Sequence, residues 1–80
     1  MSNQEKLLKA AAEVFGVDPA TINDDSSQES VPKWDSLGMV NLVAELEAVF
    51  EVQFDIMEIA DFHTIGIIKS VLVEKGVRFE

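Results

Sequence analysis

An aspartate and a serine, Asp35 and Ser36, stand directly before the long, mostly apolar run from residue 36 to about residue 51. The apolar spacing of this run predicts a helix, so Ser36 is expected at its N-terminus. The free backbone N–H groups and the dipole of a helix N-terminus favour negative charge. A phosphodiester on the Ser36 hydroxyl would therefore be stabilised, and Asp35 would be an acidic neighbour that a basic enzyme could grip.

The same serine is a poor candidate for a catalytic nucleophile. Serine needs an adjacent base to activate it, and His63, the one histidine of the chain, cannot complete a triad alone. We therefore expect no catalytic residue and no enzyme activity. The simpler interpretation of Ser36 is a helix cap, a role in which serine is common and which is compatible with its modification.

Metal binding is not expected either. The chain has no cysteine, and one histidine cannot build a zinc site. The acidic stretch "DDSSQE" lacks the glycine and the ligand spacing of a calcium loop.

The charge balance limits the partners. The 80 residues include 15 acidic and 6 basic side chains, a formal net charge of −9. Such a chain repels nucleic acid and anionic lipid, whose binding depends on lysine and arginine, and attracts basic patches on proteins. The acidity could also serve solubility alone. No apolar run approaches the roughly 20 residues of a membrane span, and the N-terminus lacks a signal-peptide core. We expect a soluble, cytoplasmic monomer.

The periodicity predicts an all-α fold, a small four-helix bundle in a single domain over residues 1–80. A first helix follows a possible capping box at Ser2 and Glu5 and ends at Gly16. Three further helices are expected. One runs from residue 36 to about 51, a short one at 56–60 is opened by the pair Asp55 and Glu58, and one runs from Thr64 to Gly76. Strands at "FEVQF" and "GIIKSVLV" are the weaker interpretation, because no hairpin turn signal joins them.

The segment between the first two helices, residues 17–35, exceeds the roughly 12–15 residues expected of a structureless loop. It should therefore be functional or pinned by contacts of its own, and Val17, Ile22 and Val31 are the candidates. Trp34, at its end, is expected to anchor in the core or at its rim. Met39 and Met57 are expected to fill the core.

The stretch "DSLGMVNLVAELEAVF" resembles the Asp-Ser-Leu signature of acyl carrier proteins. In that family the serine receives a 4′-phosphopantetheine arm from coenzyme A. The likeness covers nearly the whole chain, since "VFGVDPATINDDSS" resembles the end of the family's first helix and its long loop. "FDIMEIADFHTIGIIKSVLVEKG" is similar to the family's short third helix and its fourth helix.

The resemblance implies that Ser36 is the attachment site and that Asp35 contacts the phosphopantetheinyl transferase. The thiol of the arm would hold an acyl group as a thioester, and the domain would carry it between enzymes of fatty acid or polyketide type without doing chemistry itself. Acyl-activating, ketosynthase or acyltransferase enzymes would present basic patches to a docking face. That face would comprise Asp35, Leu37, Val40, Asn41, Ala44, Glu45 and Glu47.

The sequence departs from carriers of fatty acid synthesis, which generally have a denser acidic stripe on this helix. Gly38, Asn41 and Ala48 are uncharged here, which indicates a carrier of a specialised pathway. Gly38 could leave room for the arm or a partner, or could simply be tolerated near a helix start. An aminoacyl, peptidyl or D-alanyl cargo remains an alternative, as does, in a different class, an unmodified acidic adaptor that binds a basic protein.

Overall fold

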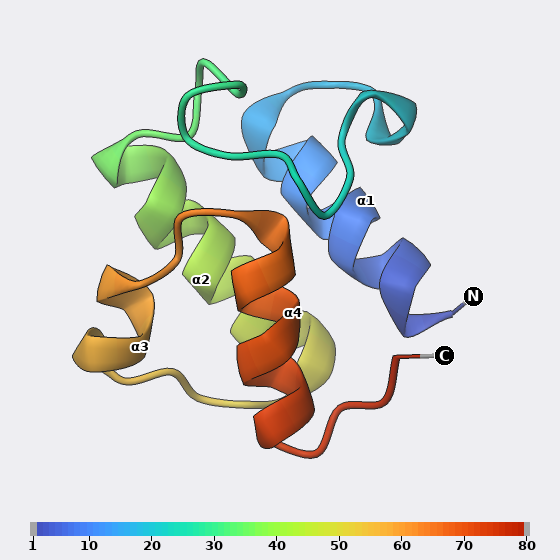
Figure 1. Cartoon of the computed structure of the whole chain (residues 1–80), viewed down its shortest axis with the longest axis vertical. Helices are drawn as coiled ribbons and strands as arrows, with labels where there is room; N and C mark the ends of the chain where they lie inside the picture. Colours follow the sequence, from blue (N-terminus) through green and yellow to red (C-terminus); the bar gives the residue numbers. More distant parts are fainter. Residues whose placement is uncertain (1, 80) are drawn as a thin grey trace.

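The computed structural model describes residues 2–79, which form four α-helices and a single 3₁₀ turn (Figure 1). The helices are α1 (Asn3–Phe15), α2 (Ser36–Phe50), α3 (Ile56–Ala60) and α4 (Ile65–Glu74), and the turn is η1 (Pro19–Thr21). The predicted all-α bundle with a short third helix is confirmed. Within the described residues no strand forms, so the strand interpretation is wrong. No helix of residues 2–79 combines the length and the apolar character needed to cross a membrane.

Local capping sets the helix ends. Ser2 and Glu5 form the predicted capping box at the start of α1, and Gly16 ends that helix in the left-handed conformation with φ of 67°. At α3, Asp55 and Glu58 form a second capping box. The hydroxyl of Thr64 caps α4 by accepting a hydrogen bond from the third residue of that helix.

The core lies among α1, α2 and α4 and consists of aliphatic and aromatic side chains. Each fully buried large side chain contributes about 1.5–3 kcal/mol to folding, and because the sequence has no cysteine, this burial stabilises the fold without disulfides. The largest fully buried side chains are Phe15, Phe62, Leu7, Leu42, Leu46, Ile65, Ile68 and Leu72.

The long loop between α1 and α2 is pinned, as its length requires. Ile22 and Val31 are buried and Val17 is half-buried against the core. Loop carbonyls also accept hydrogen bonds from the first amides of α4, from Gly66 to Asp24 at 2.8 Å and from Ile65 to Ser26 at 3.0 Å.

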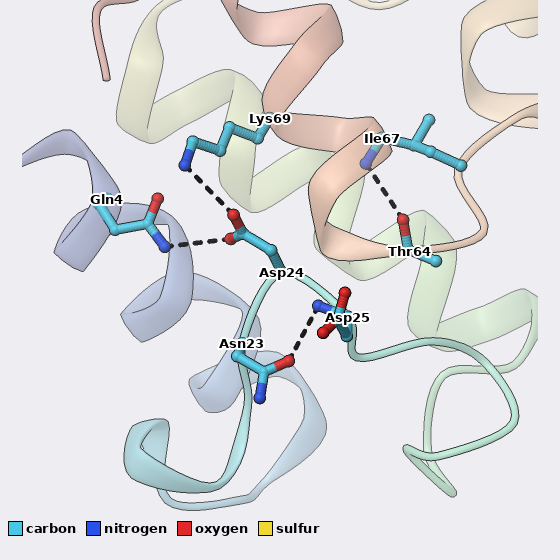
Figure 2. Close-up of polar contacts among 7 residues, drawn as sticks. All are labelled: Gln4, Asn23, Asp24, Asp25, Thr64, Ile67 and Lys69. Atoms are coloured by element: carbon cyan, nitrogen blue, oxygen red, sulfur yellow. Dashed lines mark hydrogen bonds and ion pairs between the residues drawn. The ribbon is translucent and has the colours of Figure 1, made fainter. Parts of the chain in front are cut away.

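One loop carboxylate joins two helices. Asp24 accepts hydrogen bonds from Gln4 of α1 at 3.1 Å and from Lys69 of α4 at 3.2 Å (Figure 2). The Gln4 hydrogen bond is the largest cause that lowers the pKa of Asp24, and Lys69 adds to it, while partial burial acts in the opposite direction. The loop that leads to Ser36 is thus attached to both the first and the last helix, α1 and α4.

The prediction for Met57 is wrong, whereas Met39 packs against the core as expected. Met57 is 79% exposed, and its neighbour Ile56 is 82% exposed. The orientation of α3 turns Ile59 towards the core and leaves Met57, on the far side of this five-residue helix, in solvent.

Candidate functional site

The start of α2 is capped by Asp35. Its carboxylate accepts a hydrogen bond from the backbone N–H of Gly38 at 2.8 Å, and its carbonyl accepts one from Met39 at 2.8 Å. The interpretation of Ser36 as the helix cap is therefore wrong, because Ser36 is the first residue inside the helix. The cap is worth about 1 kcal/mol, and it leaves the Ser36 hydroxyl free for another use.

The Ser36 side chain lies in solvent. Its hydroxyl forms no hydrogen bond with any residue of the described chain. The first two amides of a helix, here those of Ser36 and Leu37, lie outside the intrahelical ladder and point out of its N-terminus. A phosphate ester on this hydroxyl would sit where those amides and the helix dipole stabilise it, so the site fits a phosphopantetheine group.

Trp34 holds the chain in place two residues before this serine. Its indole is 2% exposed and stacks on the ring of Phe15, with ring centroids 5.2 Å apart. Its backbone N–H donates to the carbonyl of Val31 at 3.0 Å. The expected anchor is confirmed, and it connects the last residue of α1 to the loop that presents Ser36.

Gly38 has its explanation within the chain. The residue is buried, and the backbone carbonyl of Lys33 occupies the space that a Cβ atom at Gly38 would need. This contact explains the glycine, so neither of the two earlier interpretations is needed: that Gly38 leaves space for the arm or a partner, or that a glycine is merely tolerated near a helix start. The glycine lets the end of the loop cross closely over the first turn of α2.

The predicted docking residues lie together along α2. Leu37 and Val40 are 70% and 65% exposed, and Asn41 and Ala44 are also in solvent. Glu45 and Glu47 are half-buried at opposite edges of this stripe. The face is thus apolar along its centre.

The carboxylate of Glu47 also has a structural partner. It accepts a hydrogen bond from the backbone N–H of Phe54 at 2.9 Å, which ties α2 to the segment before α3. Glu47 therefore supports the fold as well as contributing charge to the face, a role that sequence spacing alone did not indicate.

Sequence reasoning missed the exposed apolar side chains of α3, Ile56 and Met57. A helix of five residues is too short for its periodicity to show which side faces solvent. The acidic N-cap Asp55 gave only the start of the helix, not its orientation.

Comparison with known families gives one match. The family model described as a phosphopantetheine attachment site matches residues 5–68, a span that covers most of the chain and includes Ser36. A search of curated proteins found no match. A carrier of this kind interacts with the phosphopantetheinyl transferase that installs its arm and with the enzymes of its pathway. The chain therefore belongs to the phosphopantetheine attachment site family and is a carrier protein whose cofactor is 4′-phosphopantetheine.

Proposed function

We propose that Ser36 is the attachment residue and that the protein carries acyl intermediates as thioesters between biosynthetic enzymes of fatty acid or polyketide type. The observation that carries this proposal is the exposed Ser36 hydroxyl at the N-terminus of α2, left free because Asp35 caps the helix. The protein would act as a cytoplasmic, monomeric, single-domain carrier and would have no catalytic activity of its own.

The attachment is a phosphoryl-group transfer. A bond forms between the Ser36 oxygen and the phosphorus next to pantetheine, and the bond from that phosphorus to the bridging oxygen of the coenzyme A pyrophosphate breaks. Adenosine 3′,5′-bisphosphate leaves, and the hydroxyl proton passes to a base of the transferase. The chain itself presents the hydroxyl and stabilises the new negative charge at the helix N-terminus.

Once bound, the arm supplies a thiol that holds the acyl group as a thioester. The chain holds the attachment point still, because the Trp34 stack and the Asp35 cap fix the residues on either side of the loop–helix junction. Such fixation limits the motion of the arm to its own rotatable bonds.

Docking would use the stripe on α2. We propose that the transferase and the pathway enzymes contact this stripe, which consists of Asp35, Leu37, Val40, Asn41, Ala44, Glu45 and Glu47. Partners would place lysine and arginine beside the acidic edges and apolar side chains on the centre.

The apolar centre of the stripe supports a specialised carrier. Asn41 and Ala48 are exposed on the same helix and uncharged, so long-range attraction to a strongly basic patch is weaker than on a denser acidic stripe. If the modified protein supported fatty acid elongation as well as a housekeeping carrier does, the proposal of a specialised pathway would be wrong.

The experiment is a mass measurement followed by loading. The purified protein is incubated with coenzyme A, magnesium and a broad-specificity phosphopantetheinyl transferase, and its intact mass is expected to rise by one arm. In a parallel reaction, acyl-coenzyme A replaces coenzyme A, so that the protein gains the acyl group together with the phosphopantetheine. The extra acyl mass should disappear on treatment with neutral hydroxylamine, which cleaves thioesters. An unchanged mass with several transferases would instead support an unmodified adaptor.

The cargo class needs its own comparison. The modified protein is offered to acyltransferases with acyl donors and, in parallel, to adenylating enzymes with amino acids, including D-alanine. The proposal expects loading by the acyl system. Loading by the amino acid system alone would make the protein an aminoacyl or peptidyl carrier while leaving the role of Ser36 intact.

A further inference from the structure

An open groove of about 390 Å³ lies on the surface and is lined by residues of α3 and α4 and the turn between them. Figure 1 shows where these two helices lie in the fold. The volume of the groove falls within the roughly 300–1,000 Å³ of typical ligand pockets. No residue of α2 lines it, so it is separate from the stripe beside Ser36. The lining includes the apolar residues Met57, Ile67 and Val71 and the acidic residues Asp55, Asp61 and Glu74.

Two apolar side chains of the lining, Met57 and Ile67, remain exposed, whereas Val71 also packs against the core. Met57 is 79% exposed and Ile67 is 36% exposed, although both are large apolar side chains. A methionine is flexible and polarisable, and such side chains adapt to the shape of a protein partner. Exposed apolar side chains gathered in a groove and rimmed by polar residues are typical of interaction surfaces.

The charged residues that line the groove are all acidic. Asp55, Asp61 and Glu74 are exposed, and no lysine or arginine lines the groove. Glu58, the remaining acidic residue of the lining, forms an ion pair with Lys75 at 2.9 Å. The exposed carboxylates of Asp61 and Glu74, together with that of Asp55, which also caps α3, thus face solvent around an apolar floor.

The groove is also held in shape before any partner arrives. Lys75, just beyond α4, reaches Glu58 of α3 and lies 5.6 Å from the ring centre of Phe54. Phe54 in turn packs edge-on against the buried Phe62, with ring centroids 5.1 Å apart. These contacts fix α3 against α4, so less conformational freedom is lost on binding.

We propose that this α3–α4 groove is a second docking surface, and that it binds a protein segment in which a large apolar side chain is flanked by lysine or arginine. The apolar side chain would contact Met57 and Ile67, and the basic side chains would face the carboxylates at the rim. Because the groove shares no residue with the α2 stripe, the proposal stands whether or not Ser36 carries an arm.

The test uses the 80-residue chain and two synthetic peptides, and the NMR chemical shifts of the protein report where each peptide binds. The first peptide is an amphipathic helix of leucine and lysine, and the second has the same lysines with serine in place of leucine. We expect saturable shifts from the first peptide centred on Met57, Ile67 and Val71, and only weak shifts from the second. Shifts centred on Leu37 and Val40 instead, or equal binding of both peptides, would overturn the proposal.

Two matched variants strengthen the test. Met57→Ser removes an exposed apolar side chain from the groove and is expected to weaken binding of the leucine–lysine peptide about tenfold. Val73→Ser removes another exposed apolar side chain, which lies on α4 but outside the groove, and should leave the affinity unchanged. Equal affinities for both variants would show that the groove is not the binding surface. The mass gain catalysed by the transferase is a separate readout, so failure here leaves the role of Ser36 untouched.

Discussion

The indole of Trp34 stacks on the ring of Phe15 with the ring planes 26° apart and the centroids at 5.2 Å. This contact joins the last residue of α1 to the loop residue that stands two positions before Ser36. The position of the candidate attachment site is therefore set by the hydrophobic core and not by the loop alone. A change at either ring should affect both stability and the presentation of the serine.

The first prediction concerns this stack. Trp34→Ala should lower the free energy of unfolding by about 3–5 kcal/mol, because it leaves a cavity beside Phe15. Trp34→Phe keeps an aromatic ring and removes an indole N–H that is buried without an acceptor among the described residues. It should cost less than about 1.5 kcal/mol. Urea unfolding followed by circular dichroism measures both, and equal stabilities for the two variants would contradict the stacking account.

The second prediction concerns Gly38. Gly38→Ala should lower the free energy of unfolding by about 1–3 kcal/mol, because the new methyl group overlaps the carbonyl oxygen of Lys33. Helix propensity alone predicts the opposite sign. Asn41→Ala, at an exposed position of the same helix, is the control and should be neutral or stabilising by up to about 0.7 kcal/mol. A stabilised Gly38→Ala variant would show that the loop does not approach the helix this closely.

The third prediction concerns the acid dependence of stability. Asp24 has a lowered pKa in the folded protein, chiefly because Gln4 donates a hydrogen bond to its carboxylate. The contribution of Asp24 to the free energy of unfolding is therefore fully present at pH values above its pKa in the unfolded chain, which is about 4. This contribution is lost as the pH falls through the pKa of Asp24 in the folded protein. Asp24→Asn should be less stable than the wild type near pH 7, and the difference should vanish towards about pH 2.

The size of this effect is limited by solvent. The Asp24 side chain is 44% exposed, so screening keeps the contribution below about 1 kcal/mol. Asp25→Asn, at the adjacent residue, is the control, because its carboxylate takes part in none of the loop contacts (Figure 2). Thermal unfolding across the acid range measures both variants. Identical pH profiles for Asp24→Asn and Asp25→Asn would contradict the role of the Gln4 and Lys69 contacts.

The fourth prediction concerns the end of α2. Glu51 caps this helix with φ of 55°, a left-handed conformation that costs a residue with a side chain about 1–2 kcal/mol. Glu51→Gly should therefore raise the free energy of unfolding by up to about 1 kcal/mol. Gln53→Gly, two residues on where φ is not positive, should lower it by about 0.4–1 kcal/mol. Melting temperatures that fall in both variants would contradict this reasoning.

The helix ends could be predicted from the sequence because the signals that set them are local. The capping boxes at Ser2 and Asp55 and the stop at Gly16 each depend on residues within a few positions. The exposed position of Met57 could not be predicted, since a five-residue helix carries too little periodicity to orient it. The sequence predicted that the long loop is held by contacts of its own apolar residues. It did not predict that Asp24 bridges α1 and α4, because Gln4 and Lys69 lie far from Asp24 in the chain.

At the candidate site, too, some features could be predicted from the sequence and others could not. The pattern of Asp35 and Ser36 before an apolar helix indicated the attachment residue, which stays a prediction. The pattern did not show which of the two residues caps α2. It also could not show that the backbone carbonyl of Lys33 leaves no space for a side chain at Gly38, because this close contact depends on the path of the loop.

The most direct measurement locates the arm within the chain. Trypsin cleavage after Lys33 and Lys69 releases the peptide of residues 34–69, in which Ser36 is the only serine. The preceding peptide, residues 10–33, carries Ser26, Ser27 and Ser30 and serves as an internal control. After treatment with coenzyme A and the transferase, mass spectrometry should find one arm on the 34–69 peptide and none in the Ser36→Ala variant. An arm on the 10–33 peptide, or one that persists in Ser36→Ala, would contradict the assignment of Ser36.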